Sequence, residues 1–465
     1  MRLSCRTEAH TLTSRFHPAI FNSTNYFPEN DQKEIQKGTS VMNSLKKIYC
    51  RGFQKVFRIA IPFLPYRKPK IVGSVKELPD IIRKHKCSHI LIITDQGITK
   101  LGLTKRLEKT LNREEIPYTL YDRTVANPTT VNVAEALELY KQNGCDAIIG
   151  FGGGSSMDCA KAVGARAVKP NQSLAKMKGI LKVHKKLPLL MAVPTTAGTG
   201  SETTLASVIT DAETRHKYAI NDFPLIPRYA VLDPKVTLSL PPFITATTGM
   251  DALTHAVEAY IGNSSTIDTR KDALKAVRLI FENIDDAYTH GDDVTARRNM
   301  LHASFYAGCA FTKSYVGYVH AVAHSLGGQY NVPHGYANAV LLPVVLREYG
   351  SCIYKKLHRL AEAAGVAEKD TPDKEAAESF IKAIEDMKQR FGIGDTIPEI
   401  QETDIPMLAH YADKEANPLY PVPKLMDAHE LEKFYYMLME KTGSDKESDS
   451  EDQKTQTGQE EDTDE

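Results

Sequence analysis

The stretch "FGGGSSMDCAKAVG" at residues 151–164 places three consecutive glycines between an apolar run and a helix-forming run. Gly152, Gly153 and Gly154 let the backbone approach a ligand closely, and the amides at the start of a helix favour a phosphate. The usual dinucleotide fingerprint has a third glycine where this chain has Met157. The stretch therefore predicts a phosphate-binding turn, although a plain strand-to-helix turn accounts for one or two of the glycines.

Short β-rich runs alternate with helical runs on both sides of this turn, from about residue 68 to 240. The expected helices lie at 130–143 and 156–167, and the expected strands are "HILIITD" (89–95), "DAIIGF" (146–151), "LPLLMAVPTT" (187–196) and "YAVLDP" (229–234). Such alternation is typical of parallel βαβ units, which bind ligands at the carboxyl ends of the strands. We therefore expect a Rossmann-like α/β domain in the N-terminal half.

Polar residues follow two further strands. Asp95 ends the run "LIITD", where a carboxylate can accept hydrogen bonds from an adenosine ribose and repel a 2′-phosphate, which favours NAD over NADP. A helix cap explains this aspartate equally well. "PTTAGTGSETT" (194–204) is a second Gly/Thr-rich loop, directly after a buried strand. Three strand ends with suitable chemistry predict a dinucleotide site better than any one of them.

Beyond Pro241 and Pro242 the helical period dominates. The expected helices are 244–261, 268–288, 292–313, 317–327, 354–364 and 372–391. We place the boundary between the two domains near this pair of prolines, and the C-terminal half is expected to be helical.

Two histidine-containing pairs lie in these helices at a spacing of four. Asp251 and His255 form one pair, His320 and His324 form the other, and His334 follows past a glycine turn. Residues four apart share a helix face, and a carboxylate with several imidazoles suits Fe²⁺, Zn²⁺ or Ni²⁺ better than Mg²⁺ or Ca²⁺. A divalent metal site is predicted, and the spacing leaves open which three of the four histidines bind.

The net charge of zero over 465 residues hides two charged ends. Residues 42–70 carry eight Lys or Arg and no acidic residue, whereas residues 445–465 carry ten acidic residues and two lysines. The body between them is nearly neutral, which gives no reason to expect a nucleic acid partner. No run of about eighteen uncharged apolar residues occurs, so no transmembrane segment is expected. Seven scattered cysteines without CxxC spacing favour a reducing compartment.

The charged ends are expected to lie outside the main machinery. Residues 1–41 are predicted to be a disordered extension that faintly resembles a transit peptide, with Met42 as an alternative start, and residues 441–465 a disordered acidic tail. Residues 42–65 form a basic amphipathic segment that suits an anionic membrane surface. Docking of its apolar face on the body or on a partner subunit is the favoured interpretation.

Together, these segments resemble the iron-containing (group III) alcohol dehydrogenase family. The motifs occur in family order: "TD" at 94–95, "NPTT" at 127–130, "GGGSSMDCAKAVG" at 152–164, "PTTAGTGSE" at 194–202, "TGMDALTHAVEAY" at 248–260 and "HAVAHSLGG…PHG" at 320–335. The resemblance implies a dehydroquinate synthase-like, two-domain fold. A Rossmann-like domain (66–241) and an all-helical domain (242–440) would then enclose the active site.

The resemblance also implies the roles of individual residues. The metal ligands would be Asp251, His255, His320 and His334, and His324 would relay protons. The cofactor would be held by Asp95, Asn127, Gly153, Gly154, Ser155, Thr195, Thr196, Thr199 and Lys217.

The implied activity is that of an NAD- and Fe²⁺-dependent alcohol dehydrogenase, with Zn²⁺ as the alternative metal. It would interconvert a small alcohol and its aldehyde or ketone by hydride transfer from a metal-bound alkoxide. The alternatives are a dehydroquinate-synthase-like lyase that uses metal and NAD, and a cofactor-binding scaffold. We expect a homodimer or a higher homo-oligomer in the cytoplasm, or in mitochondria if residues 1–41 are a transit peptide.

Overall fold

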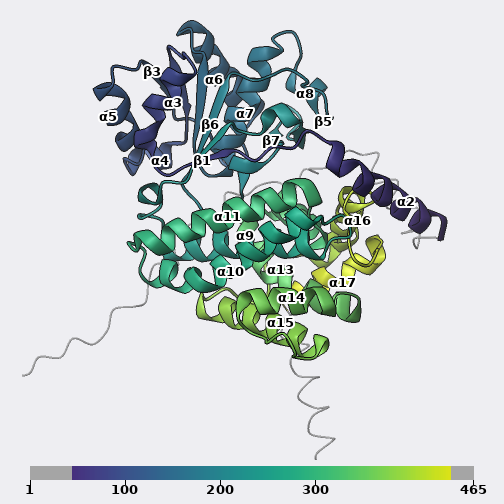
Figure 1. The fold of residues 1–465 in the computed structure, drawn as a ribbon. Helices are drawn as coiled ribbons and strands as arrows, with labels where there is room; N and C mark the ends of the chain where they lie inside the picture. Colours follow the sequence, from purple (N-terminus) through teal and green to yellow (C-terminus); the bar gives the residue numbers. More distant parts are fainter. Residues whose placement is uncertain (1–43, 441–465) are drawn as a thin grey trace, which may run out of the picture.

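The computed structural model describes residues 44–440, and the predictions for residues 1–41 and for the acidic tail lie outside them. An α/β part built around a parallel sheet sits against a larger helical part, as Figure 1 shows. This arrangement confirms the predicted fold class. The domain limits 66–241 and 242–440 stay predictions.

Six parallel strands form the main sheet in the order β1-β9-β6-β4-β2-β3. They are β1 (Lys70–Val72), β2 (Ile90–Ile93), β3 (Tyr118–Tyr121), β4 (Ala147–Gly152), β6 (Leu189–Pro194) and β9 (Tyr229–Val231). All four strands expected from the sequence are present. Every residue of β2 and β4 is buried, as expected of central strands covered on both faces.

The strand order creates a switch point between β2 and β4. After β2 the chain adds β3 on one side, and then returns to place β4 on the other side of β2. Doubly wound sheets bind ligands in the crevice at such a point, outside the carboxyl ends of the strands. Asp95 follows β2 and the glycine turn follows β4, so both predicted ligand-binding segments lie at this crevice.

Helices and a small side sheet complete the α/β part. The helices are α3 (Leu78–Lys84), α4 (Gln96–Lys100), α5 (Lys105–Arg113), α6 (Thr130–Gln142), α7 (Gly154–Val168) and α8 (Leu174–Met177). The side sheet contains β5 (Gly179–Ile180), β8 (Lys217–Asn221) and β7 (Ala206–Thr210) in that order.

The helical part is built around α9 (Pro242–Ile261), which is buried along nearly its whole length. Around it lie α10 (Ile267–Thr289), α11 (Val294–Ser314), α12 (Tyr318–Tyr330), α13 (His334–Tyr349), α14 (Tyr354–Ala364), α15 (Asp373–Arg390), α16 (Ile405–Ala416) and α17 (Ala428–Leu438). Because α9 is surrounded, its few ionisable side chains face the protein interior and need partners there.

The N-terminal helix α2 (Ser44–Ala60) lies along the outer side of the helical part (Figure 1). Its buried residues are Cys50 and Gln54, and Gln54 Nε2 donates to the carbonyl of Tyr420 at 2.7 Å. The Arg51 guanidinium donates to the carbonyls of Val422 and Pro423. The expectation that the apolar face docks on the body is wrong for the described chain, because these polar contacts fix the opposite face and leave Leu45, Ile48 and Val56 exposed. Docking of that face on a partner subunit stays a prediction.

None of the helices between residues 44 and 440 combines the length and the hydropathy that crossing a bilayer requires.

Candidate metal centre

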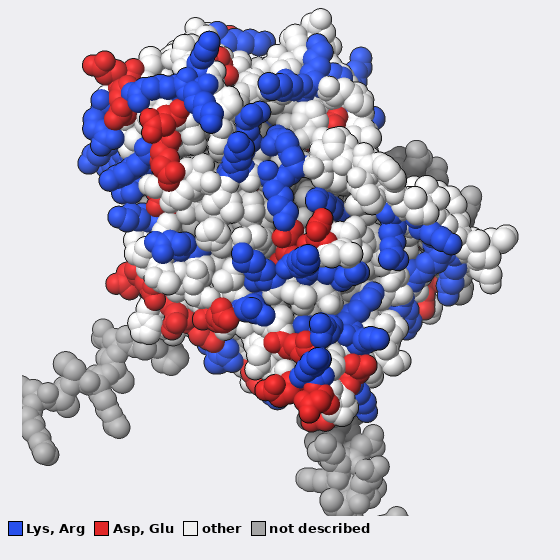
Figure 2. Space-filling model, viewed as in Figure 1, with Lys and Arg blue, Asp and Glu red and all other residues white. Residues whose placement is uncertain are grey.

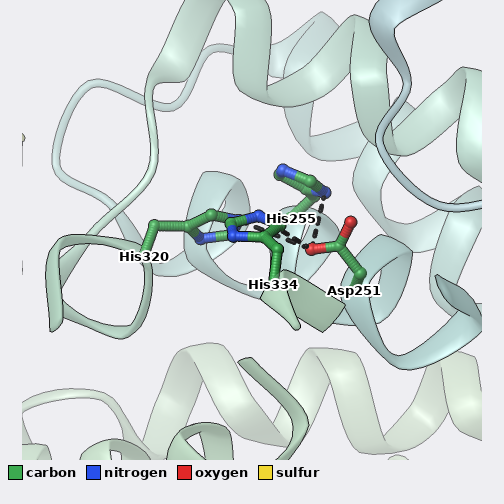
Figure 3. A group of neighbouring side chains, drawn as sticks. All are labelled: Asp251, His255, His320 and His334. Atoms are coloured by element: carbon green, nitrogen blue, oxygen red, sulfur yellow. Dashed lines mark ion pairs between the residues drawn. The ribbon is translucent and has the colours of Figure 1, made fainter. Parts of the chain in front are cut away.

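Four side chains from three helices of the helical part converge; three of them are buried, and the His334 side chain is 38% exposed. Asp251 and His255 come from α9, His320 from α12 and His334 from the first turn of α13, and one donor atom from each lies within 4.8 Å of the others. Figure 3 shows the three imidazoles directed toward the carboxylate. The distances from Asp251 Oδ1 are 3.8 Å to His255 Nδ1, 3.8 Å to His320 Nε2 and 3.4 Å to His334 Nε2. These separations suit donors that share one ion with bonds of about 2 Å.

Two of the converging nitrogens lack any other partner. Within residues 44–440, His255 Nδ1 and His320 Nε2 are buried and have no hydrogen-bond partner. An unpaired buried polar atom costs about 1–3 kcal/mol, so such atoms call for a ligand. Burial also lowers the pKa of both histidines, which keeps the imidazoles neutral with a lone pair free to bind a cation. The donor set therefore fits a borderline divalent metal ion.

Glu258 supports the cluster from the next turn of α9. Its Oε2 lies 2.6 Å from His320 Nδ1, and the carboxylate also accepts from the backbone amides of Gly317 and Val319. Burial raises the pKa of Glu258 to about 7. Because Nδ1 of His320 is engaged with Glu258, Nε2 is the atom directed at the metal position. Sequence reasoning missed this residue, and a glutamate within the apolar run "HAVEAY" was its signal.

We expect Glu258→Gln to weaken metal binding by about 10–100-fold, the usual loss when an outer partner of a metal ligand is replaced. The amide would no longer fix the orientation and tautomer of His320 as the carboxylate does. Competition against a chelator measures the affinity. The matched control is Glu415→Gln, which alters the partner of the non-ligand His324 and should leave metal affinity unchanged. Equal metal affinity in wild type and Glu258→Gln would refute the role.

His324 lies beside the cluster but outside it. Its ring is 5.1 Å from that of His334 and 5.9 Å from that of His320, measured between centroids. Its Nδ1 lies 2.6 Å from Glu415 Oε1, and its side chain is 40% exposed. It therefore lies between the candidate metal cluster and solvent.

Asp95 joins the two strand ends at the switch point. Its Oδ1 accepts from the amide of Ile98, which caps α4, and its Oδ2 accepts from Ser156 Oγ at 3.3 Å. A Cβ on Gly152, which has φ of +146°, would lie 2.6 Å from Ser156 Oγ. Only glycine permits this close turn. The helix-cap interpretation is thus confirmed, and Oδ2 is bonded to the first turn of α7.

The Gly/Thr-rich loop at 194–204 lies directly beside the glycine turn at 152–154. The Thr195 amide donates to the Gly152 carbonyl at 3.0 Å. A Cβ on Gly153 would lie 3.8 Å from Thr196 Oγ1, and one on Gly154 would lie 3.2 Å from Thr199 Cγ2. Ser155 follows in the first turn of α7. The structure thus brings the glycines, Ser155 and the three threonines together.

The same loop reaches the metal cluster. A Cβ on Gly198 would lie 2.7 Å from Cβ of Thr248, which is less than one turn before Asp251 on α9. A Cβ on Gly200 would lie 2.8 Å from Cα of Gly308 on α11, so backbone meets backbone there. The predicted cofactor segments and the predicted metal ligands therefore form one continuous site.

Asn127 and Lys217 form a separate pair. Asn127 has a positive φ of 56°, and its Oδ1 accepts from Lys217 Nζ at 2.8 Å. The pair comes from the loop before α6 and from the start of β8.

A buried network that the sequence did not indicate holds the second loop against α7. Lys161 is fully buried, and its ammonium donates to Ser201 Oγ, Thr204 Oγ1 and the carbonyl of Ala206. Ser201 Oγ in turn donates to Asp158 at 2.7 Å. Burial lowers the pKa of Lys161. The lysine thus ties α7 to the second loop.

Comparison with known proteins identifies the family. A family model described as iron-containing alcohol dehydrogenase matches residues 70–234, and its C-terminal counterpart matches residues 245–439. The chain belongs to the iron-containing alcohol dehydrogenase family. This confirms the resemblance noted in the sequence motifs and the assignment as an oxidoreductase.

Three similar proteins illustrate the family. Alcohol dehydrogenase 4 of Saccharomyces cerevisiae is 37% identical over 348 residues, which cover 74% of this chain and 89% of that protein. The NAD-dependent methanol dehydrogenase of Bacillus methanolicus is 34% identical over 342 residues, which cover 73% of this chain and 90% of that protein. The crystal structure of a 1,3-propanediol oxidoreductase matches with a TM-score of 0.77 and 35% identity, covering 80% of this chain and 99% of that one.

Proposed function

We propose that this member of the family is an NAD-linked, metal-dependent dehydrogenase that interconverts a small alcohol and its aldehyde or ketone. The observation that carries the proposal is that the candidate cofactor and metal sites adjoin each other. Gly198 contacts α9 beside Asp251, while its neighbour Thr199 contacts the glycine turn at 152–154. A similar protein is named as an NAD-dependent methanol dehydrogenase, and the family description names iron.

Each group of residues has a distinct task. The Asp251 carboxylate and the three imidazoles would hold the ion, which when bound supplies Lewis-acid polarisation of the alcohol oxygen. The amides of Gly154 and Ser155, with Gly153 before them, would hold the pyrophosphate at the N-terminus of α7. Asp95 and the pair Asn127–Lys217 would bind the adenosine ribose.

The remaining residues act near the reacting atoms. The three threonines of the second loop (Thr195, Thr196 and Thr199) would hold the nicotinamide side of the cofactor against the metal position, where close positioning lowers the barrier to hydride transfer. His324 would accept the proton of the alcohol hydroxyl and pass it outward through its exposed edge beside Glu415.

Metal analysis of the purified protein, combined with a screen of alcohols for NADH formation, tests the proposal. Net NADH formation with stoichiometric metal is expected. A lyase that uses NAD only transiently would give no net NADH, and a scaffold would give no turnover with any alcohol. Metal analysis also decides between Fe²⁺ and Zn²⁺. Assembly into a homodimer or higher oligomer and a cytoplasmic location stay predictions.

We expect Asp95→Gly to shift the cofactor preference from NAD toward NADP, because the carboxylate that repels a 2′-phosphate is removed. Glycine is tolerated at a helix N-cap at a cost of a few tenths of a kcal/mol, so α4 should persist. The ratio of kcat/KM for the two cofactors is the measurement. The control is Ser156→Ala, which removes the partner of Asp95 Oδ2 but keeps the charge and should keep NAD preference. An unchanged ratio in Asp95→Gly would count against the ribose role.

A further inference from the structure

Helix α2 carries an apolar surface that the proposed function does not use. The helix precedes residue 70, where the match to the family model begins. The exposed fractions along one side of α2 and the turn after it range from 38% at Phe53 to 84% at Phe63. We call this the outer stripe; its residues are Leu45, Ile48, Tyr49, Phe53, Val56, Ile59 and Phe63.

The outer stripe cannot turn inward while α2 keeps its contacts. Gln54 and Arg51 donate to backbone carbonyls of residues 420–423, and Lys46 pairs with Asp413 on α16. The ring of Phe57 packs edge-on against that of Tyr315. These contacts attach the opposite side of α2 to the helical part, so the outer stripe faces away from it.

Basic side chains accompany the stripe. The helix contains five Lys or Arg and no acidic residue, and Lys47, Lys55 and Arg58 are exposed. A shallow cavity of about 710 Å³ between α2 and residues 423–425 is lined by Lys47 and Lys55. Arg51 and Lys424 also line it, but Arg51 donates to main-chain carbonyls and Lys424 pairs with Glu348. Figure 2 shows uncharged surface along the outer edge of the molecule at α2, with Lys and Arg side chains beside it.

The positive charge of α2 distinguishes between two partners that could cover the outer stripe: the α2 of a second copy, and a membrane. Pairing of α2 with the α2 of a second copy would bring ten basic residues together with no acidic residue of either helix to compensate, which disfavours a helix-to-helix dimer. A bilayer that contains anionic phospholipids accepts both features, because apolar side chains enter the acyl boundary while Lys and Arg meet the phosphates. We propose that α2 docks this protein on an anionic membrane surface, with the lined cavity as the site for lipid phosphates.

Flotation of the full-length protein with vesicles tests this inference. Vesicles of phosphatidylcholine alone and vesicles that also contain phosphatidylserine are compared. We expect binding to the anionic vesicles only, and we expect it to weaken as salt is raised, since salt screens the attraction. Binding to neither vesicle, or equal binding to both, would overturn the proposal.

Two sets of substitutions separate the contributions of the stripe and the charge. Ile48→Ser, Val56→Ser and Ile59→Ser together should lower the partition coefficient by about tenfold for each side chain. Lys47→Gln, Lys55→Gln and Arg58→Gln together should lower it by about fivefold for each charge on anionic vesicles. The matched controls are Ile267→Ser, an exposed apolar residue on α10, and Lys182→Gln, Lys185→Gln and Lys186→Gln on the α/β part, none of which should alter binding.

Two further measurements keep the result interpretable. Circular dichroism and NAD-linked activity without vesicles should match the wild type in all variants, because none of the residues belongs to the site. Light scattering measures the molar mass of each variant in solution. If the stripe variants lower the molar mass of the particle, the stripe joins protein copies and the membrane proposal fails.

Discussion

Replacing His320 by alanine is expected to remove metal binding and NAD-linked turnover together. His320 Nε2 is a buried atom without another partner, 3.8 Å from Asp251 Oδ1, so the cluster loses one of four donors. Loss of an outer partner alone costs about 10–100-fold in metal affinity, and loss of a ligand must exceed that. We therefore expect at least about a hundredfold weaker binding and activity at background.

Thermal unfolding gives this prediction a readout that does not depend on substrate. A ligand present at 100 times its Kd stabilises the folded state by about 2.7 kcal/mol. Added metal should raise the Tm of the wild-type apoprotein and leave that of His320→Ala where it was. A His320→Ala protein that still gains stability from stoichiometric metal would remove this residue from the ligand set.

Replacing His324 by alanine is expected to give the opposite combination. His324 lies one turn from His320 on α12, but its Nδ1 contacts Glu415 and its side chain is 40% exposed. The variant should keep its metal content and its metal-dependent rise in Tm. Its kcat should fall by about 10²–10⁴, the usual contribution of a positioned proton-transfer group.

External imidazole separates proton transfer from structural damage. The site left by His324 opens to solvent, so added imidazole should restore part of the turnover in His324→Ala and none in His320→Ala. Loss of metal from His324→Ala would place this histidine among the ligands and reject the assigned division of roles.

Part of the candidate metal cluster was predictable because helical spacing brings residues four apart onto one face. Asp251 with His255 shows this directly. The choice among the four histidines was open from spacing and followed only from the family motifs. The structure brings His320 and His334 to within reach of Asp251 and leaves His324 on Glu415. The role of Glu258 could not be predicted, since a glutamate in a helix is ordinarily exposed and only tertiary packing buries this one.

Sequence patterns did not predict helix α13 or the orientation of α2. Helix α13 is apolar on nearly all sides and contains Pro343, so it has neither the amphipathic period nor the composition that predicts a helix. For α2 the period correctly grouped most of the exposed apolar residues on one face, whereas Phe57 packs against Tyr315 on the opposite side. Which face would contact the body depended on carbonyl groups at residues 420–423, about 370 residues away, and no local pattern carries that information.

The contact between Gly200 and Gly308 has a mechanical consequence. With no side chain on either residue, the main chain of the loop that bears the threonines lies directly against that of α11, and a Cβ at Gly308 would lie 2.2 Å from Thr203 Oγ1. A side chain at either glycine would therefore push the loop away from α11 and separate the threonines from the helix bundle that carries the candidate metal ligands.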